Sequence, residues 1–426
     1  MQSFIPANFN LFLNWTIDLL FPVLLKTVQN INEVVISEED KDMLRSLKKE
    51  RLIFFSNHPT TAEPPIAYYI ANIMGTRFKY MASRQVFDWS FGMVGKVISN
   101  IGAFSVIAGI ADRESLKAAR SALAEPEGKL VLFPEGEPTS GENDNLMPFQ
   151  AGLAQLGFWG YEDAIKLDPK ADVKILPSFI KYIVDASEKE IRADLEDSVT
   201  AIEFKYNINP GKKNLLRRFL TIGRYMVEEA ESEYSIPDGD KHDFDYRIGR
   251  IRHTILDNLA DRFNIKSFDK NQDAIMKLRQ LFAVMELVSI GYPDSNLPKM
   301  NDSDIELFKK ECIKAFDFIV IKGDYLASNP TPERFYEWLA RYESYIFGKT
   351  PRALGGEPTH LPRKAFVSFK KPFGLSEYYK EYKSKKREAI DTMMARLRND
   401  MQELLESSMY LSRPLIKPFD TESLVD

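Results

Sequence analysis

His58 is the histidine best placed to act as a catalytic base. It directly follows an apolar run, RLIFFSN (51–57), and it precedes Pro59, whose ring resets the backbone before a helix. Strand ends of an α/β sheet are where such folds bind ligands. The other three histidines lie in charge-rich helical sequence or in a Gly/Pro loop, and we expect them to be surface or structural residues: His242, His253 and His360.

Glu63 is the carboxylate that can orient His58. The two residues are five positions apart, which within one helix would point them to different faces. If His58 lies in a turn and Glu63 in the first helical turn, the carboxylate can reach back to one imidazole nitrogen. Such a bond fixes the tautomer and raises the basicity of the other nitrogen. The bare His-x4-Glu pattern is weak by itself, because many chains contain one by chance.

Further polar residues follow the other apolar runs. KLVLFP (129–134) leads into Glu135, which could hold an acceptor hydroxyl or shape a pocket, or could simply end a strand in a turn. Arg84 and Arg113 each lie near a predicted strand or helix end, where a guanidinium can bind a phosphate. Either arginine alone is more often a surface charge.

Alternating strands and helices position these residues. The predicted strands are 51–57, 78–83, 103–107, 129–134 and 173–184, and the predicted helices between them are 63–74, 87–98 and 113–123. This alternation predicts an α/β layer. The continuous apolar runs indicate strands that are covered on both faces.

The chain then changes character. The predicted helices are 212–234, 243–264, 270–290, 302–323 and 331–347, and they are followed by a strand, 364–372, and an amphipathic helix around 390–405. We therefore predict a mixed, mostly parallel sheet flanked by helices, with a large helical insertion. The predicted segments are an amphipathic membrane-associating segment 1–40, an α/β core 41–186, the insertion 187–360, a completing strand and helix 361–410, and a C-terminal tail 411–426. We expect only the acidic end of this tail, 420–426, to be solvated.

Composition excludes several classes of function. The net charge of −5 argues against a nucleic-acid-binding protein. The single cysteine, Cys312, allows no internal disulfide and fits a reducing compartment. No His or Cys spacing indicates zinc, so we expect no metal.

The most apolar stretch is 9–25, FNLFLNWTIDLLFPVLL. Polar residues and a proline interrupt it, so it falls short of the roughly 20 apolar residues that a membrane span needs. It fits equally a helix in the membrane interface and a helix packed on the protein's own core. Because no secretory signal is visible, we expect a cytoplasmic protein that associates peripherally with a membrane.

Taken together, the motifs resemble the PlsC-type glycerolphosphate acyltransferase family. That family carries Asn-His-x4-Asp, then a Gly-rich segment with Arg, then Phe-Pro-Glu-Gly, then an apolar strand ending near Pro. The matching residues are Asn57-His58, Gly102-Ala103-Phe104 with Arg113 downstream, Phe133-Pro134-Glu135-Gly136, and Ile175-Leu176-Pro177. The resemblance covers roughly 40–185 and resumes at AFVSFKKPFGLSEYY (365–379).

The resemblance implies an enzyme of phospholipid biosynthesis. Its reaction would be transfer of a fatty acyl group from acyl-CoA or an acyl carrier protein to a hydroxyl of a glycerolipid, such as a lysophospholipid or glycerol phosphate, without a cofactor. It implies catalytic roles for His58 and Glu63. It implies substrate binding by Asn57, Arg84, Arg113, Glu135 and Gly136.

Two departures from the family pattern keep alternatives open. Glu63 replaces the usual Asp, and Glu137-Pro138-Thr139-Ser140 replaces the usual Thr-Arg-Ser. The lost arginine weakens the case for a phosphate on the acceptor. The alternatives are a weakly active or inactive lipid-binding scaffold on the same fold, and a thioesterase that uses water as acceptor. The oligomeric state is left open.

Overall fold

The computed structural model describes residues 4–110, 112–136, 143–237, 243–320, 323–349 and 357–420. Predictions for His242, for the loop Glu137–Ser140 and for the end of the tail, 421–426, fall outside the described residues. The chain divides into two compact units, Met1–Asp185 with Ala353–Leu411, and Ala186–Arg352 with Ser412–Asp426.

An eight-stranded sheet organises the first unit. Its order is β1-β7-β6-β2-β5-β3-β4, with β8 paired to β6. The pairs β1–β7, β2–β5, β2–β6, β3–β4 and β3–β5 are parallel, and only β6 with β7 and β8 are antiparallel. This confirms the predicted mixed, mostly parallel sheet. The strands are β1 (Ile31–Val35), β2 (Arg51–Phe55), β3 (Lys79–Ser83), β4 (Ala103–Val106), β5 (Lys129–Leu132), β6 (Val173–Val184), β7 (Arg363–Phe369) and β8 (Phe373–Gly374).

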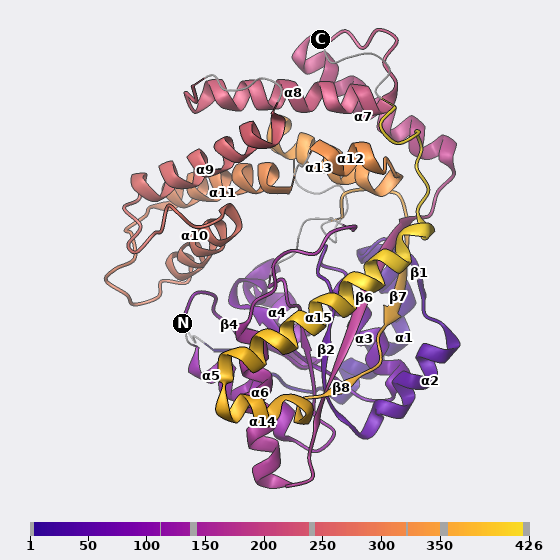
Figure 1. Ribbon diagram of the computed structural model, residues 1–426, viewed down its shortest axis with the longest axis vertical. Coiled ribbons are helices and arrows are strands. Elements are labelled where there is room, and N and C mark those ends of the chain that lie inside the picture. Colours follow the sequence, from indigo (N-terminus) through magenta and orange to yellow (C-terminus); the bar gives the residue numbers. More distant parts are fainter. Residues whose placement is uncertain are drawn as a thin grey trace. The chain divides into compact units, whose positions relative to one another are not determined.

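Helices cover both faces of the sheet, as the apolar strands require. In β2, Leu52 and Phe54 pack in one core with α2 and α3, while Ile53 and Phe55 pack in a second core with α5, α6, α14 and α15. Figure 1 shows α15 crossing one face of the strands. The helices of this unit are α1 (Leu11–Val28), α2 (Glu38–Ser46), α3 (Glu63–Met74), α4 (Met93–Asn100), α5 (Arg113–Ala124), α6 (Gly152–Leu167), α14 (Ser376–Ser384) and α15 (Lys386–Ser408), with 3₁₀ segments η1 (Leu47–Lys49), η2 (Arg84–Gly92) and η3 (Met409–Leu411).

One predicted helix, 87–98, is wrong in its first half. The segment η2 is kinked, because Ser90 and Phe91 adopt positive φ angles of 50° and 56° and Gly92 one of 82°. The regular helix α4 begins only at Met93. The break leaves the Phe91 side chain fully exposed to solvent.

Helix α1 extends beyond the apolar stretch identified in the sequence. It runs to Val28 and, by length and composition alone, is long and apolar enough to cross a membrane. Whether the helix spans a membrane or lies on one is not decided by length and composition. One side of α1 packs on α3, where Phe21 stacks on Tyr68 and Tyr69.

The second unit is helical and lies in the chain between β6 and β7. Its helices are α7 (Glu188–Tyr206), α8 (Leu215–Glu233), α9 (Phe244–Arg262), α10 (Ala274–Ser289), α11 (Asp302–Val320), α12 (Gly323–Ser328) and α13 (Pro332–Phe347). The described part of the C-terminal segment belongs to this unit, since the N–H groups of Leu415 and Phe419 donate to the carbonyls of Pro330 and Ala327. The segment 411–426 was predicted as a C-terminal tail, and these bonds tie the backbone of its described part to α12 and the turn after it.

Candidate active site

The carboxyl ends of four parallel strands bring the candidate residues to one edge of the sheet. Strands β2, β5, β3 and β4 are neighbours in this order and run parallel. His58 follows β2, Glu135 follows β5, Arg84 follows β3, and Arg113 follows the loop after β4. Ligands of such sheets bind outside the carboxyl ends of the strands.

Asn57 fixes the backbone that leads from β2 to His58. Its side-chain amide donates to the Ile180 carbonyl at 2.9 Å, and its oxygen accepts from the Ile180 N–H at 2.8 Å. The side chain thereby continues the pairing of β2 with β6 by one more step. Asn57 is buried and these bonds hold the backbone next to His58, while the substrate binding that the resemblance implied stays a prediction.

His58 and Glu63 form a hydrogen-bonded pair. Nδ1 of His58 lies 2.7 Å from Oε2 of Glu63, and the imidazole stacks on Phe133 with the ring centroids 4.2 Å apart. As predicted, His58 lies in the turn and Glu63 is the first residue of α3. Since Nδ1 faces the carboxylate, Nε2 is the nitrogen available to take a proton.

Glu63 is completely buried and accepts four hydrogen bonds. Oε2 receives His58 Nδ1–H and the Thr60 N–H at 3.1 Å, and Oε1 receives the Thr60 hydroxyl at 2.9 Å and the Tyr182 hydroxyl. Donors to both oxygens fix the orientation of the carboxylate. A buried carboxylate held in this way is suited to stabilise an imidazolium.

Glu135 binds the protein backbone. Its two oxygens accept the His58 N–H at 2.9 Å and the Met147 N–H at 2.8 Å, and the side chain is buried. Of the three readings considered for Glu135, these contacts favour shaping of the site, because this carboxylate ties the His58 turn to the loop after β5. Gly136 has a φ of +85°, and a Cβ there would lie 1.7 Å from the Gln150 amide nitrogen. Gly136 is therefore required by the turn itself.

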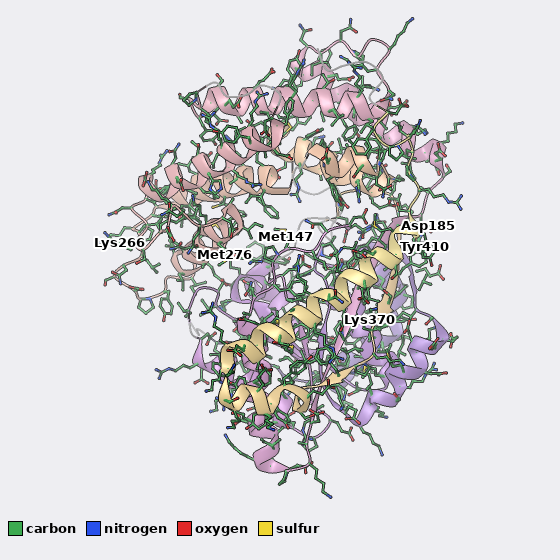
Figure 2. The ribbon with its side chains drawn as sticks, viewed as in Figure 1. Met147, Asp185, Lys266, Met276, Lys370 and Tyr410 are labelled. Atoms are coloured by element: carbon green, nitrogen blue, oxygen red, sulfur yellow. The ribbon has the colours of Figure 1, made fainter. Side chains whose placement is uncertain are left out.

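Helix α15 supports the same loop. Arg398 donates to the carbonyls of Leu146 and Met147 at 3.0 and 2.9 Å, and its guanidinium lies 5.1 Å from the Phe149 ring centroid. Met147, labelled in Figure 2, thus connects the C-terminal helix with Glu135. The late helix completes the support of the site.

The two arginines differ in their surroundings. Arg84 is buried and its guanidinium pairs with Asp88 at 2.8 Å. Arg113 begins α5 behind the N-cap Asp112, and its side chain is exposed. Within the described residues Arg113 has no hydrogen-bond or ion-pair partner, so it is the freer of the two to bind an anion. The loop that lacks the family's arginine, Glu137–Ser140, lies outside those residues.

Sequence reasoning missed three members of the site. Tyr182 in β6 could have been noticed as a hydroxyl in a buried strand, since such hydroxyls usually have a partner. Arg363 lies over the Tyr182 ring and pairs with Glu357; the two residues come from the start of β7 and from the chain before it, and no motif points to them. Among the described residues no group of histidine, cysteine and carboxylate side chains could hold a metal ion.

Comparison with known families agrees with this geometry. The model of the acyltransferase family matches residues 34–181, which include β2, His58, Glu63 and the Phe-Pro-Glu-Gly turn. No curated protein matches the chain. The match spans the strands whose ends carry the buried His–Glu pair. Residues 34–181 are therefore a domain of the PlsC-type glycerolphosphate acyltransferase family, and the protein is an acyltransferase.

Proposed function

We propose that the enzyme transfers a fatty acyl group from an acyl thioester, acyl-CoA or acyl carrier protein, to a hydroxyl of a membrane glycerolipid in phospholipid biosynthesis. The observation that carries this proposal is the His58–Glu63 pair, whose Nδ1–Oε2 distance is 2.7 Å, at the carboxyl end of β2. The hydrogen bonds around Glu63 favour an active enzyme over an inactive scaffold, because they orient this carboxylate toward His58 as a base-orienting group requires.

In the proposed reaction Nε2 of His58 accepts the proton of the acceptor hydroxyl. The hydroxyl oxygen attacks the thioester carbonyl, the C–S bond breaks as the C–O bond forms, and the leaving thiolate takes the proton back from the imidazolium. Glu63 stabilises the imidazolium through Nδ1. General-base catalysis of this kind contributes about 10²–10⁴ in rate. The chain's own side chains supply every proton transfer in this scheme.

A panel of acceptors tests the proposal. The full-length protein is incubated with acyl-CoA or acyl carrier protein and with glycerol phosphate or different lysophospholipids. We expect an acylated lipid as the product. Release of free fatty acid without a lipid product would identify a thioesterase, and absence of both products with every donor and acceptor would identify a scaffold.

Arg113 is the residue that we expect to bind an anionic part of a substrate, either an acceptor phosphate or the phosphates of CoA. Arg113→Ala should raise the KM for that substrate by about 10- to 100-fold with a smaller effect on kcat, because a charge-assisted hydrogen bond is worth roughly 1.5–3 kcal/mol. Arg113→Lys should recover only part of the loss, since lysine lacks the bidentate fork. Steady-state kinetics with both substrates measures this.

A matched control for Arg113 is Arg387→Ala, which removes an exposed arginine of α15 whose side chain is 95% exposed. Both KM values should stay at the wild-type level in this control. Unchanged KM values for donor and acceptor in Arg113→Ala would exclude Arg113 from substrate binding.

Helix α1 offers a surface for the membrane. Its buried residues face the domain, while a stripe on the other side leaves large apolar side chains in solvent: Leu11, Phe12, Trp15, Leu19, Leu20, Val23, Leu24 and Val28. Exposed apolar patches of this kind on a soluble fold mark interaction sites. An amphipathic helix with tryptophan and phenylalanine on its apolar face suits the lipid headgroup boundary.

The polar residues of α1 favour a helix that lies on the membrane over one that crosses it. Asn14 donates to the Asn100 carbonyl at 3.0 Å, and Asp18 accepts from Tyr68 at 2.7 Å and pairs with Arg77 at 2.5 Å. A spanning helix would lose these bonds and carry Asp18 into the hydrocarbon, which is costly. The bond from Tyr68 to Asp18 attaches the apolar stripe to α3, the helix that carries Glu63.

A second apolar element follows β3, at the sheet edge that carries His58. The side chains of Trp89, Phe91, Met93 and Val97 are exposed, and Phe91 is held outward by its positive φ of 56°. Positive φ is unfavourable for an aromatic residue, and such strain is often retained where function requires it. This loop would place apolar side chains in the lipid at the same edge of the sheet as His58.

Polar substitutions on α1 should reduce membrane binding. The double variant Trp15→Ser and Leu19→Ser changes side chains that are 75% and 79% exposed, so the fold should be kept. Burial of each side chain is worth about 1.5–3 kcal/mol, so we expect the liposome partition coefficient to fall by more than tenfold. Phe91→Ser should weaken binding further. Co-sedimentation with liposomes measures the effect, and wild-type binding should survive moderate salt.

Phe204→Ser is the control, because this residue of the helical unit is 89% exposed but belongs to neither apolar element. Its partition coefficient should equal that of the wild type. If the Trp15 and Leu19 double variant binds liposomes as well as wild type, α1 is not the membrane-binding element.

A further inference from the structure

Behind the His58–Glu63 pair lies a buried group of side chains that the proposed reaction does not use. The Tyr182 hydroxyl donates to Oε1 of Glu63, on the side of the carboxylate away from His58. Burial, with Glu63 adding to the effect, raises the pKa of Tyr182 well above its usual value, so this hydroxyl keeps its proton. Tyr182 is therefore a permanent donor to Glu63.

The Tyr182 ring in turn supports a buried ion pair. The Arg363 guanidinium lies 4.3 Å from the centroid of this ring, and it pairs with Glu357. Glu357 is completely buried and Arg363 is nearly so. Both residues lie outside the segment that matches the acyltransferase family, residues 34–181. The Glu357–Arg363 ion pair is thus connected to Glu63 through Tyr182, and it comes from a part of the chain beyond the family domain.

The ionisable side chains around Glu63 come from separate parts of one unit. They are Tyr182 of β6, Glu357 before β7 and Arg363 of β7, and Glu135 after β5 binds the backbone of His58. With Glu357 ionised, Arg363 is neutralised and the charge of Glu63 is free to stabilise the imidazolium. With Glu357 protonated, the positive charge of Arg363 competes with the imidazolium for Glu63.

We propose that Tyr182, Glu357 and Arg363 are positioning residues of the His58–Glu63 dyad: Tyr182 holds the carboxylate, and the Glu357–Arg363 pair sets the charge that His58 experiences. The expected effect on catalysis rests on the proposed function, whereas the positioning role itself rests on the contacts described above. Burial raises the pKa of Glu357 to about 7, with Arg363 opposing the rise and Glu63 adding to it. Glu357 therefore changes charge near neutral pH, and the strength of the base changes with it.

The direction of the pH effect follows from these signs. As the pH falls through about 7, Glu357 takes a proton and the uncompensated Arg363 disfavours protonation of His58. Glu357→Gln imitates this state at every pH. We therefore expect Glu357→Gln to lower the midpoint of the His58 titration by about one pH unit, the order expected for one buried charge.

A double variant separates charge from structure. Glu357→Gln with Arg363→Met removes both charges and keeps a side chain of similar length against Tyr182. Removal of one partner of a buried pair leaves an unpaired charge, whereas removal of both is often tolerated. The midpoint should therefore return most of the way to its wild-type value. A purely structural role predicts the opposite, a double variant that is more perturbed than the single one.

The measurement is a nuclear magnetic resonance titration of the full-length protein labelled with ¹⁵N-histidine. Four histidine signals are expected, and the one lost in His58→Gln belongs to His58. The acid limb of the kcat/KM profile should move with the midpoint. A midpoint that is unchanged or raised in Glu357→Gln, or one that the double variant does not restore, would overturn the proposal.

The titration remains informative if Glu357→Gln does not fold and if the protein does not transfer acyl groups. If Glu357→Gln does not fold, the shape of the His58 titration still decides, because coupling to Glu357 broadens the wild-type curve and the double variant should give a one-proton curve. One-proton curves in both proteins would leave no role for Glu357. The titration needs no turnover, so an enzyme without acyl transfer but with the expected shifts would refute the proposed function alone.

Discussion

Replacement of His58 by alanine should abolish acyl transfer. Nδ1 of His58 is held by Glu63 at 2.7 Å and the ring is held against Phe133, so Nε2 is presented in one orientation. Within the described residues Nε2 has no other hydrogen-bond partner. We expect kcat to fall by about 10²–10⁴, the range of a lost general base. The fold should persist, since the Glu135 bond is made to the backbone N–H of residue 58.

The measurement for His58 is single-turnover acyl transfer with circular dichroism as a check on folding. His253→Gln is a suitable control, because His253 belongs to the helical unit and contacts Lys277 there. This control should transfer acyl groups at the wild-type rate. A folded His58→Ala protein that keeps more than about a tenth of the wild-type rate would rule out His58 as the base.

Helix α3 and strand β6 were predicted correctly because their local sequence and their packing in the fold favour the same structure. The predicted bounds of α3 and β6 coincide with the observed ones, Glu63–Met74 and Val173–Val184. Pro residues in the first turn and Gly75 at the C-cap, with a φ of 68°, mark the ends of α3. Strand β6 is apolar along most of its length because it lies between β2 and β7.

Helix α6 shows why other elements escaped prediction. It contains glycines, which lower helix propensity by about 1 kcal/mol each. The structure shows why they are needed: a Cβ at Gly157 would lie 3.0 Å from Ile53, and one at Gly160 would lie 2.7 Å from Leu123. Close packing against β2 and α5 therefore outweighs propensity. Strand β1 was missed because its sequence, INEVV, contains polar residues, as an edge strand allows.

The site was predictable only where the interacting side chains lie close together in the sequence. His58 and Glu63 are five residues apart, so a turn and a helix start were enough to pair them. The function of Glu135 depends on two backbone N–H groups, from His58 and Met147, and no side-chain pattern records such a partner. Tyr182 and Arg363 meet only because β6 and β7 pair as antiparallel neighbours.

Replacement of Glu63 by glutamine should remove most of the same rate factor without loss of the fold. The amide oxygen can keep the bonds from His58 Nδ1–H and the Thr60 N–H that Oε2 now accepts. The amide nitrogen would then face the hydroxyls of Thr60 and Tyr182, which can rotate to accept a hydrogen bond. The substitution therefore keeps the geometry and removes the charge, and the imidazolium loses its stabilising partner.

The expected result for Glu63→Gln is a fall in kcat of about 10²–10³, close to that of His58→Ala, with little change in KM. The double variant of His58→Ala and Glu63→Gln should be no slower than His58→Ala alone, because the two residues act as one unit. Single-turnover rates of the four proteins give this coupling directly. A folded Glu63→Gln enzyme with the wild-type rate would show that the charge is not needed.

Glu63→Asp distinguishes between two explanations for the glutamate that stands where the family has aspartate. If the backbone were that of a typical member, aspartate would keep or raise the activity. The structure argues against this outcome, since the longer side chain reaches His58 and Thr60 with one oxygen and Thr60 and Tyr182 with the other. One methylene less shortens the reach by about 1.5 Å, and a misplacement of about 1 Å can cost 10²-fold in oriented catalysis. We therefore expect Glu63→Asp to lower kcat by about tenfold to a hundredfold. A rate equal to or above that of the wild type would show that the contact with Tyr182 is dispensable, and the turn from Asn57 to Glu63 would then have to adopt a different conformation during catalysis.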